Sequence, residues 1–491
     1  MGFGRSSPLG AGFCREGLAG LRPLASYLFQ KPPHVYVGGF YHLVVVFYTH
    51  MKRTLIGELG QNVGKEVMIS GWVDVRRDHG KLVFLDIRDR SGSVQSVCLP
   101  NHAEALETAQ KLRPEWVVTI EGVVNERPEK MRTDGVNGSI ELEATAVSVL
   151  AEAAELPFPK DEEVNLDTRL DNRPLTLRSA RERAIFSVQA TIVDAYRRSL
   201  ARQGFTEFMA PGLVGGDAEG GAAVFKVGYY DHPAAYLATS PQLYKQIMVG
   251  VYERVSTIAK VFRAEKSSTT RHLSESTQMD FEIGFIKDEN DVMDVLETTI
   301  RDVVKEVSEK HAGAFALLGA EAPQLGDKFP RITLREAQEI VGSSEDDMDP
   351  EGERTICEWA KKEHGSDFIF ITKFPAKVRA FYTMPDEAAG EGLSRGFDLL
   401  FRGLEINSGA QRIHQYDEMV KRFEARGMDP KKFSFYLQAF KYGMPPHGGC
   451  STGLDRFTMK MLGLENVRES SLFPRDMNRI DTRLTLDEDN A

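Results

Sequence analysis

Residues 261–273 read VFRAEKSSTTRHL, and residues 279–285 read MDFEIGF. Each apolar run is typical of a β-strand, and the polar loop that separates the runs lies between Arg263 and Arg271. Arginines on both sides of a loop between antiparallel strands can hold a polyphosphate, because the guanidinium group binds phosphate oxygens through paired hydrogen bonds. This stretch therefore predicts an antiparallel sheet with a hairpin whose arginines either bind a polyphosphate or form surface salt bridges.

The sequence on both sides of this hairpin alternates between helical and strand patterns from residue 179 to residue 491. Apolar residues at helical spacing predict a helix over residues 179–204: Ile185, Val188, Ile192, Ala195 and Leu200. Residues 368–372 (FIFIT) predict a buried strand, and residues 453–457 (GLDRF) begin a helix. Residues 449–453 (GCSTG) match the nucleophile elbow of hydrolases, but the Gly- and Pro-rich sequence before them lacks the expected apolar strand, so we interpret the match as coincidence.

The N-terminal third has a different pattern. Short alternating runs at residues 67–73, 82–88, 94–97 and 116–122 predict an all-β domain over residues 51–153. Such short strands suit a small closed barrel of the OB type, which binds single-stranded nucleic acid. A Pro- and acid-rich stretch predicts a hinge over residues 154–178. Residues 1–50 are expected to be an extension, either an over-extended reading frame before Met51 or a targeting segment.

Composition and charge exclude several classes of protein. The 491 residues are 42% hydrophobic and 27% charged, which excludes collagen-like, disordered and multi-span membrane proteins. A net charge of −11 excludes a basic coat for nucleic acid, so a nucleic-acid partner must meet a local basic patch. The 4 cysteines form no CxxC pair and favour a reducing, cytoplasmic location. The apolar run at residues 35–48 is shorter than the ~20 residues of a membrane helix, so no membrane partner is expected.

Together these segments resemble the class II aminoacyl-tRNA synthetases, specifically the compact archaeal and eukaryotic-like aspartyl-tRNA synthetases. Residues 204–211 resemble motif 1, residues 262–273 motif 2 and residues 453–456 motif 3. The resemblance implies an α+β chain: an N-terminal OB-fold β-barrel plus a class II catalytic domain, over residues 179–491, built on an antiparallel sheet flanked by helices. It also implies a homodimer.

The resemblance implies an ATP-dependent ligase. Arg263 and Arg456 are the catalytic residues it implies, with Arg263 at the α-phosphate. The ATP-binding positions that match are Arg263, Glu265, Arg271, His272, Leu273, Glu405, Gly453, Leu454, Asp455 and Arg456. Glu405 and Ser408 match the positions that bind Mg²⁺, and hard oxygen ligands suit this ion. Catalysis would work by positioning and charge neutralisation, without a protein nucleophile.

For the amino acid, the resemblance implies L-aspartate. The matching positions are Glu219, Gln242, Lys245, Arg263, Asp280, Ser408 and Arg412. Lys245 and Arg412 would face the side-chain carboxylate, whereas neutral asparagine would leave two buried cations without a counter-charge. The alternatives are an asparaginyl-tRNA synthetase, an asparagine synthetase-like paralogue and a catalytically dead synthetase-like binding protein.

In the barrel, the residues that match the anticodon-reading positions are Arg77, His79, Phe84 and Gln95. Phe84 would stack on a base, and Arg77 and Gln95 would bond base edges. Family members with His at position 79 tend to charge tRNA(Asn) as well as tRNA(Asp), and an amidotransferase then acts on the Asp-tRNA(Asn). One position departs from the family pattern, because Ser276 stands where aspartyl enzymes commonly carry a Phe that stacks on adenine.

Overall fold

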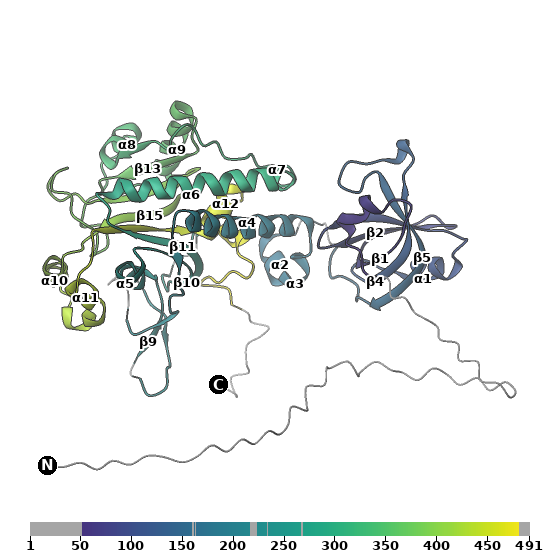
Figure 1. Ribbon diagram of the computed structural model, residues 1–491, viewed down its shortest axis with the longest axis horizontal. Helices are drawn as coiled ribbons and strands as arrows, with labels where there is room; N and C mark the ends of the chain where they lie inside the picture. Colours follow the sequence, from purple (N-terminus) through teal and green to yellow (C-terminus); the bar gives the residue numbers. More distant parts are fainter. Residues whose placement is uncertain are drawn as a thin grey trace, which may run out of the picture. The chain divides into compact units, whose positions relative to one another are not determined.

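The chain forms two compact units that divide between Glu155 and Leu156. The computed structural model describes residues 52–159, 162, 164–216, 223–232, 234–266 and 269–480 (Figure 1). The expected extension over residues 1–50 lies outside the described residues, as does Glu219. In the part of the chain that is described, no helix combines the length and the apolar character that a membrane span requires.

The first unit is a closed barrel with the strand order β1-β2-β3-β5-β4. Its strands are β1 (Glu66–Asp78), β2 (Val83–Asp89), β3 (Gly92–Cys98), β4 (Val117–Glu126) and β5 (Ile140–Ala151). The helix α1 (Ala103–Lys111) connects β3 to β4, and the short helices are η1 (Ile56–Asn62) and η2 (Glu129–Met131). Alternate residues such as Ile69, Leu85 and Ile120 fill the interior. The OB-type barrel expected from the sequence is confirmed.

The second unit is built on an eight-stranded sheet with the order β12-β13-β14-β15-β16-β11-β10-β6. The strands are β6 (Thr206–Glu207), β10 (Arg254–Phe262), β11 (Glu275–Gly284), β12 (Arg331–Thr333), β13 (Phe368–Thr372), β14 (Gly396–Phe401), β15 (Glu405–Arg412) and β16 (His447–Gly453). All neighbours are antiparallel except the outermost pairs, β12 with β13 and β6 with β10. The antiparallel sheet predicted from residues 261–285 is therefore confirmed.

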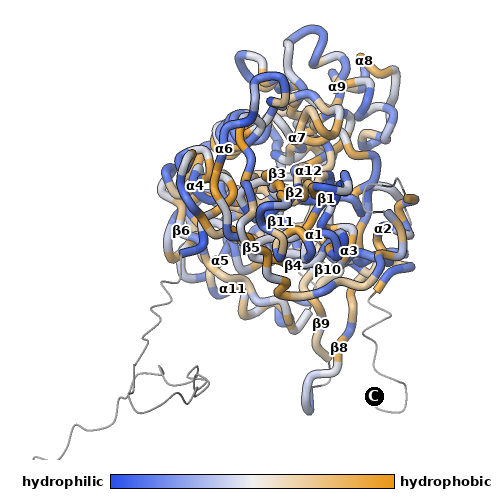
Figure 2. Tube along the Cα trace, turned by 90° about the vertical axis from the view of Figure 1, so that its right-hand side faces the viewer, coloured by the Kyte–Doolittle hydropathy of each residue, from blue (hydrophilic) through white to orange (hydrophobic). Residues whose placement is uncertain are grey.

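Two long helices, α4 (Ala180–Arg202) and α6 (Glu289–Lys310), run side by side along this sheet (Figure 1). The helix α4 begins where the sequence predicts, because the Ser179 side chain accepts a hydrogen bond from the amide of Glu182 and caps it. Hydrophobic and hydrophilic residues are interspersed along both helices (Figure 2), and the apolar ones, such as Ile192 and Leu296, are buried.

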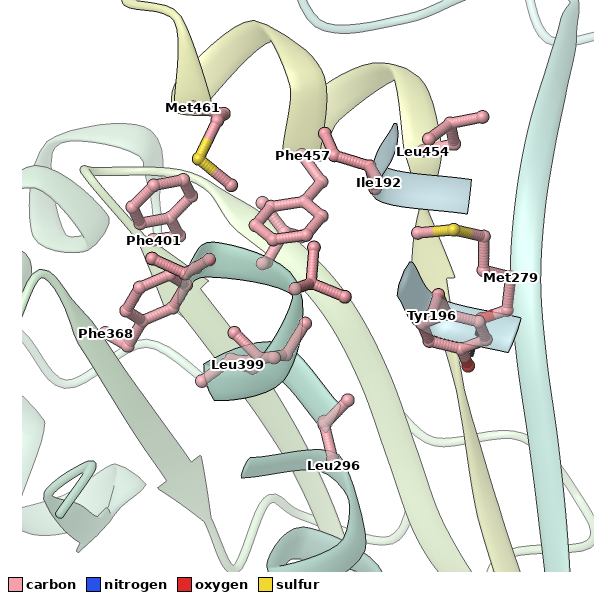
Figure 3. Packing of buried hydrophobic residues seen from close by; sticks show 14 of the residues in the cluster. Ile192, Tyr196, Met279, Leu296, Phe368, Leu399, Phe401, Leu454, Phe457 and Met461 are labelled. Carbon is pink, nitrogen blue, oxygen red and sulfur yellow. Dashed lines mark hydrogen bonds between the residues drawn. The ribbon is translucent and has the colours of Figure 1, made fainter. Parts of the chain in front are cut away.

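The core between sheet and helices is rich in aromatic rings. Phe457 points into it from α12 (Leu454–Met461), as Figure 3 shows. Its ring lies 5.8 Å from that of Phe401, which stacks on Phe368 with centroids 4.2 Å apart. The remaining helices are α5 (Gln242–Tyr252), α7 (Ala312–Leu318), α8 (Leu334–Val341), α9 (Pro350–His364), α10 (Tyr416–Ala425), α11 (Ser434–Lys441), η3 (Pro430–Phe433) and η4 (Val467–Ser470). A small separate sheet has the order β7-β9-β8: β7 (Leu213–Val214), β9 (Ala235–Leu237) and β8 (Lys226–Val227).

The stretch expected as a hinge contains two short helices, α2 (Leu166–Asp171) and α3 (Arg173–Thr176). Arg173 donates to the carbonyls of Ser471 and Leu472, at 2.9 and 2.6 Å, and forms an ion pair with Glu182 at 2.8 Å. These bonds attach α3 to α4 and to the segment after η4, within the second unit.

Candidate active site

The centre of the large sheet carries a cavity of about 340 Å³. The strands β11, β15 and β16 and the first turn of α12 supply its floor, and the loop between β10 and β11 supplies one wall. The predicted site residues that line it are Gln242, Arg263, Arg271, His272, Leu273, Glu405, Ser408, Arg412, Gly453, Asp455 and Arg456. Segments far apart in the sequence thus meet in one place, because β11, β15 and β16 are neighbours in the sheet.

One end of the cavity gathers arginines. Arg456 donates from Nε to the carbonyl of Arg271 at 3.2 Å and from Nη1 to the carbonyl of Glu405 at 3.1 Å. The side chain of Arg271 pairs with Glu353 of α9 and donates to the carbonyl of Gly403 at 3.3 Å. Arg263 lies at the base of the loop, where its amide donates to the carbonyl of Ser274 at 2.9 Å. The hairpin arginines expected to bind a polyphosphate therefore border the same cavity as Arg456.

His272 lies in this cationic region. Its Nδ1 lies 2.6 Å from Oγ1 of Thr269. Partial burial, together with the charges of Arg456 and Arg271, lowers the pKa of the imidazole below its usual value. A neutral imidazole at this place can lie beside a nucleotide without adding charge.

Beneath the other end of the cavity lies a buried cluster of four charges, formed by Lys245, Asp280, Glu282 and Arg412. Nζ of Lys245 lies 2.8 Å from Oδ2 of Asp280 and 3.5 Å from Oε2 of Glu282. Nε of Arg412 lies 2.8 Å from Oε1 of Glu282. Lys245, Asp280 and Glu282 have no exposed surface, and only Arg412 of the four lines the cavity.

The cluster is electrically balanced. Burial alone would raise the pKa of Glu282, but the charges of Arg412 and Lys245 outweigh it and hold the pKa below its usual value. Asp280 has its own hydroxyl donor, since Oγ of Ser451 donates to its Oδ1 at 2.7 Å. Lys245 and Arg412 therefore already have counter-charges in Asp280 and Glu282. The expectation that neutral asparagine would leave both cations without a counter-charge has to take these two carboxylates into account.

Arg412 keeps a donor for a ligand. Its Nη2 donates to the carbonyl of Gly449 at 2.8 Å and to Oε1 of Gln242 at 3.3 Å, and the ring of Tyr382 lies 5.1 Å from its guanidinium carbon. Within the described residues, Nη1 makes no hydrogen bond. A carboxylate that entered the cavity could bind this nitrogen without displacing Glu282.

The residues expected to hold a metal ion lie on β15 beside a further carboxylate. Asp398 of β14 is paired in register with Ser408, and Arg379 donates to both of them, to Asp398 at 2.9 and 2.6 Å and to Ser408 at 3.1 Å. Burial and the negative charge of Asp398 raise the pKa of Glu405 to about 7. Among the described residues no cluster of three or more His, Cys, Asp or Glu side chains could hold a metal by itself. Hard oxygens in this number fit Mg²⁺, which takes one or two carboxylates and completes its shell with phosphate and water.

Some predicted residues lie elsewhere. Glu265 is exposed on the loop and does not line the cavity, and Leu454 is buried in the core beneath α12. Lys245 and Asp280 lie below the cavity floor. Ser276, the departure from the family pattern, lines the same cavity as Arg456 and leaves no aromatic ring at its position.

Sequence reasoning missed two carboxylates, Glu282 and Asp398. Glu282 lies two residues beyond Asp280, so both side chains point to the same face of β11. Asp398 is a lone acid in the apolar run of residues 396–401. A buried carboxylate in an apolar strand requires a partner, and this signal could have identified both residues.

The barrel brings its predicted residues onto adjacent strands. Arg77 of β1 is paired in register with Phe84 of β2, and its guanidinium binds Asp86 through two hydrogen bonds of 2.7 and 2.9 Å. Nη2 of Arg77 also lies 3.4 Å from Oε1 of Gln95 on β3. The ring of His79 meets that of Phe84 edge-on, with centroids 5.6 Å apart. These side chains form one outer face with an aromatic ring and several hydrogen-bonding groups, which suits unstacked bases.

Comparisons with known proteins agree with both units. The family described as tRNA synthetases class II (D, K and N) matches residues 165–477, and the OB-fold nucleic acid binding domain matches residues 67–150. The aspartate--tRNA(Asp/Asn) ligase of Thermus thermophilus is 44% identical over 438 residues, which cover 87% of this chain and 99% of that protein. The aspartate--tRNA(Asp) ligase of Pyrococcus furiosus is 37% identical over 446 residues, which cover 88% and 99%.

The fold agrees with solved structures as well. The asparaginyl-tRNA synthetase from Pyrococcus horikoshii, complexed with asparaginyl-adenylate, superposes with a TM-score of 0.80 at 32% identity, over 87% of this chain and 99% of that one. The family match over residues 165–477 includes the described residues that line the cavity. The chain therefore belongs to the class II tRNA synthetases of the group that comprises the aspartate, lysine and asparagine enzymes.

Proposed function

We propose that this protein is an aspartate–tRNA ligase, which activates L-aspartate with ATP and transfers the aspartyl group to tRNA. The observation that carries the proposal is that one cavity has two cationic ends. Arg263, Arg271 and Arg456 lie at one end, and Arg412, whose Nη1 has no hydrogen bond to the described residues, lies at the other. The first end suits a polyphosphate, and the second suits a side-chain carboxylate. Relatives named aspartate--tRNA ligases support the assignment.

The reaction then needs no protein nucleophile. An oxygen of the aspartate α-carboxylate attacks the α-phosphorus of ATP, and the bond to pyrophosphate breaks. Arg263 stabilises the charge on the α-phosphate, and Arg271 and Arg456 hold the leaving phosphates. The terminal ribose hydroxyl of tRNA then attacks the adenylate carbonyl carbon and releases AMP. Gln242, which lines the cavity, is assigned to the substrate ammonium group, and the buried Asp280 lies behind it and holds Ser451 of the cavity wall.

Mg²⁺ is the proposed metal. Glu405 and Ser408 would hold it, with Asp398 as a further neighbour, and when bound it neutralises phosphate charge. Burial, together with the negative charge of Asp398, raises the pKa of Glu405 to about 7, although the charges of Arg456 and Arg379 act to lower it.

The proposed tRNA partners are tRNA(Asp) and tRNA(Asn). Support comes from His79 beside Phe84 on the barrel face and from the name of the Thermus relative. Asp-tRNA(Asn) is a mischarged product, so an amidotransferase would have to convert it. We assign anticodon binding to residues 51–153, a hinge to residues 154–178 and catalysis to residues 179–491.

We also propose a homodimer in the cytoplasm. The dimer is supported by three exposed apolar side chains, Val251, Tyr252 and Phe285. The amide of Gly284 donates to the carbonyl of Glu253 at 2.8 Å and brings the ends of α5 and β11 together, so these side chains lie in one region of the surface, and an exposed apolar patch is typical of a protein interface. Cys98, Cys357 and Cys450 are buried free thiols, which favours a reducing compartment. Light scattering after size-exclusion chromatography tests the dimer directly.

The deciding experiment measures ATP–pyrophosphate exchange with aspartate and with asparagine as the only amino acid. We expect exchange with aspartate alone. Exchange with asparagine alone would make the protein an asparagine enzyme, and no exchange with either would make it a binding protein.

Charging of separate tRNA(Asp) and tRNA(Asn) transcripts then tests the second step. We expect aspartate on both transcripts from the natural protein, and a selective loss of tRNA(Asn) charging in His79→Leu. Charging of tRNA(Asp) alone by the natural protein would contradict the relaxed specificity.

A further inference from the structure

Glu353, which has no assigned role, touches the site through Arg271. It lies in the first turn of α9, away from the motif segments in sequence, and is 7% exposed. Its Oε2 accepts a hydrogen bond from Nη2 of Arg271. The same nitrogen of Arg271 donates to the carbonyl of Gly403, in the turn between β14 and β15. One edge of the guanidinium is thus fixed by two acceptors from outside the loop.

The two acceptors belong to a tightly packed support. Gly403 has a φ of +76°, and a Cβ there would lie 2.7 Å from Cγ of Arg354. Only glycine therefore lets the turn approach the first turn of α9 this closely. The Glu353 carboxylate and the Gly403 carbonyl thus come from two segments that pack closely against each other.

The remaining donors of the Arg271 guanidinium border the cavity. Arg271 lines the cavity, and its Nε and Nη1 form no hydrogen bond within the described residues. A guanidinium has five N–H donors in a planar fork, so fixing one edge orients the other. The loop before Arg271 is polar, and its described hydrogen bonds at this end are local: the amide of Arg271 donates to Oγ1 of Thr269, which also lies 2.6 Å from Nδ1 of His272.

We propose that Glu353 is a positioning residue for ATP: it holds one edge of Arg271 so that the opposite donors meet the terminal phosphates. This inference rests on the proposed function, in which Arg271 binds those phosphates. The opposite role would be competition, in which Glu353 occupies Arg271 until a phosphate displaces it. The two roles predict opposite changes in the KM for ATP.

The test compares Glu353→Gln with the natural protein in aspartate-dependent pyrophosphate exchange. Gln keeps the size and the oxygen acceptor but removes the charge. We expect the KM for ATP to rise about tenfold, the KM for aspartate to stay unchanged and kcat to fall less than the KM rises. Glu351→Gln is the matched control, since Glu351 is an exposed acid in the same turn of α9 and its side chain forms no ion pair with the described residues of the cavity.

A double-mutant cycle separates positioning from general support of the fold. In an Arg271→Ala background, Glu353→Gln should leave the KM for ATP unchanged, because the group through which it acts is gone. Equal thermal unfolding of all variants shows that each is folded. An independent, additive effect of Glu353→Gln in that background would overturn the inference.

The remaining outcomes are also decisive. A fall in the KM for ATP in Glu353→Gln would establish competition and overturn positioning. An unchanged KM for ATP would overturn positioning as well, without establishing competition. Absence of aspartate-dependent exchange in the natural protein would instead contradict the proposed function. The affinity for ATP alone, measured by calorimetry, would then still compare Glu353→Gln with the natural protein.

Discussion

At the scale of single residues, Arg412 and Glu282 depend on each other. Arg412 is 5% exposed and Glu282 is fully buried, and their side chains meet at 2.8 Å. Removing one partner of such a pair leaves an uncompensated charge in a poorly hydrated place, whereas removing both does not. The pair therefore allows the structural and the ligand-binding roles of Arg412 to be measured separately.

We expect Arg412→Gln to lower the free energy of unfolding by about 3 kcal/mol and to abolish measurable exchange with aspartate. In the double variant with Glu282→Gln, stability should recover while aspartate activation stays lost, because no cation faces the ligand. Urea unfolding and pyrophosphate exchange report the two effects. Recovery of exchange in the double variant would show that Arg412 does not bind the substrate.

His447 gives a second residue-scale prediction. It is fully buried, its Nδ1 donates to the carbonyl of Pro445 at 2.9 Å, and its Nε2 accepts from Gln246 at 2.9 Å, so only the neutral ring fits. Burial lowers its pKa to about 4; Glu282 acts to raise it, whereas Arg412 acts to lower it.

Between pH 6.5 and about 4, the unfolded chain takes up a proton that the folded His447 does not, so stability falls as the pH falls. From pH 7.5 to pH 5, we expect the natural protein to lose about 2 kcal/mol more than His447→Gln. Urea unfolding at both pH values measures the difference. Parallel losses in the two proteins would mean that this ring titrates normally.

At the scale of elements, β16 shows where sequence patterns fail. It is a central strand with the sequence HGGCSTG, which has no run of large apolar residues, and sequence reasoning gave no strand there. Its small residues are required by close packing, since a Cβ on Gly449 would lie 2.2 Å from Oε2 of Glu282 and from the carbonyl of Phe281. The apolar strand β13 and the capped helix α4 were predictable because their patterns are local.

Gly449→Ala should therefore lower the free energy of unfolding by about 2 kcal/mol or more, because the backbone of β11 must move. The matched control is Gly313→Ala in α7, where nothing lies within 4 Å of the new Cβ. That control should be neutral or slightly stabilising, since alanine favours a helix. Chemical denaturation of both variants checks the prediction, and equal stabilities would contradict it.

At the scale of the whole molecule, the two units carry separate parts of the proposed reaction. The described charged residues of the amino-acid and ATP site all belong to the second unit, and the anticodon candidates Arg77, Phe84 and Gln95 belong to the barrel. The sequence predicted both units, since barrel strands and motif segments are local. It did not predict Glu282 or Glu353, because their roles depend on contacts between distant segments.

Phe84→Ala should raise the KM for tRNA about tenfold or more, because stacking on a base is lost, and should leave aspartate-dependent exchange unchanged. Met131→Ala is the control, as an exposed apolar residue of the barrel outside the face formed by Arg77 and Phe84. Aminoacylation and exchange on the same preparations compare the two steps. A parallel loss of exchange would show that Phe84 acts on the catalytic unit.

The burial of the cluster formed by Lys245, Asp280, Glu282 and Arg412 sets how the two steps respond to ionic strength. Mobile ions screen charges in solvent over about 10 Å at 0.1 M salt but do not enter a closed core. Arg77, whose side chain is 42% exposed, acts in solvent, whereas Lys245 does not. Added potassium chloride should therefore weaken tRNA charging steeply while the choice of aspartate over asparagine stays constant.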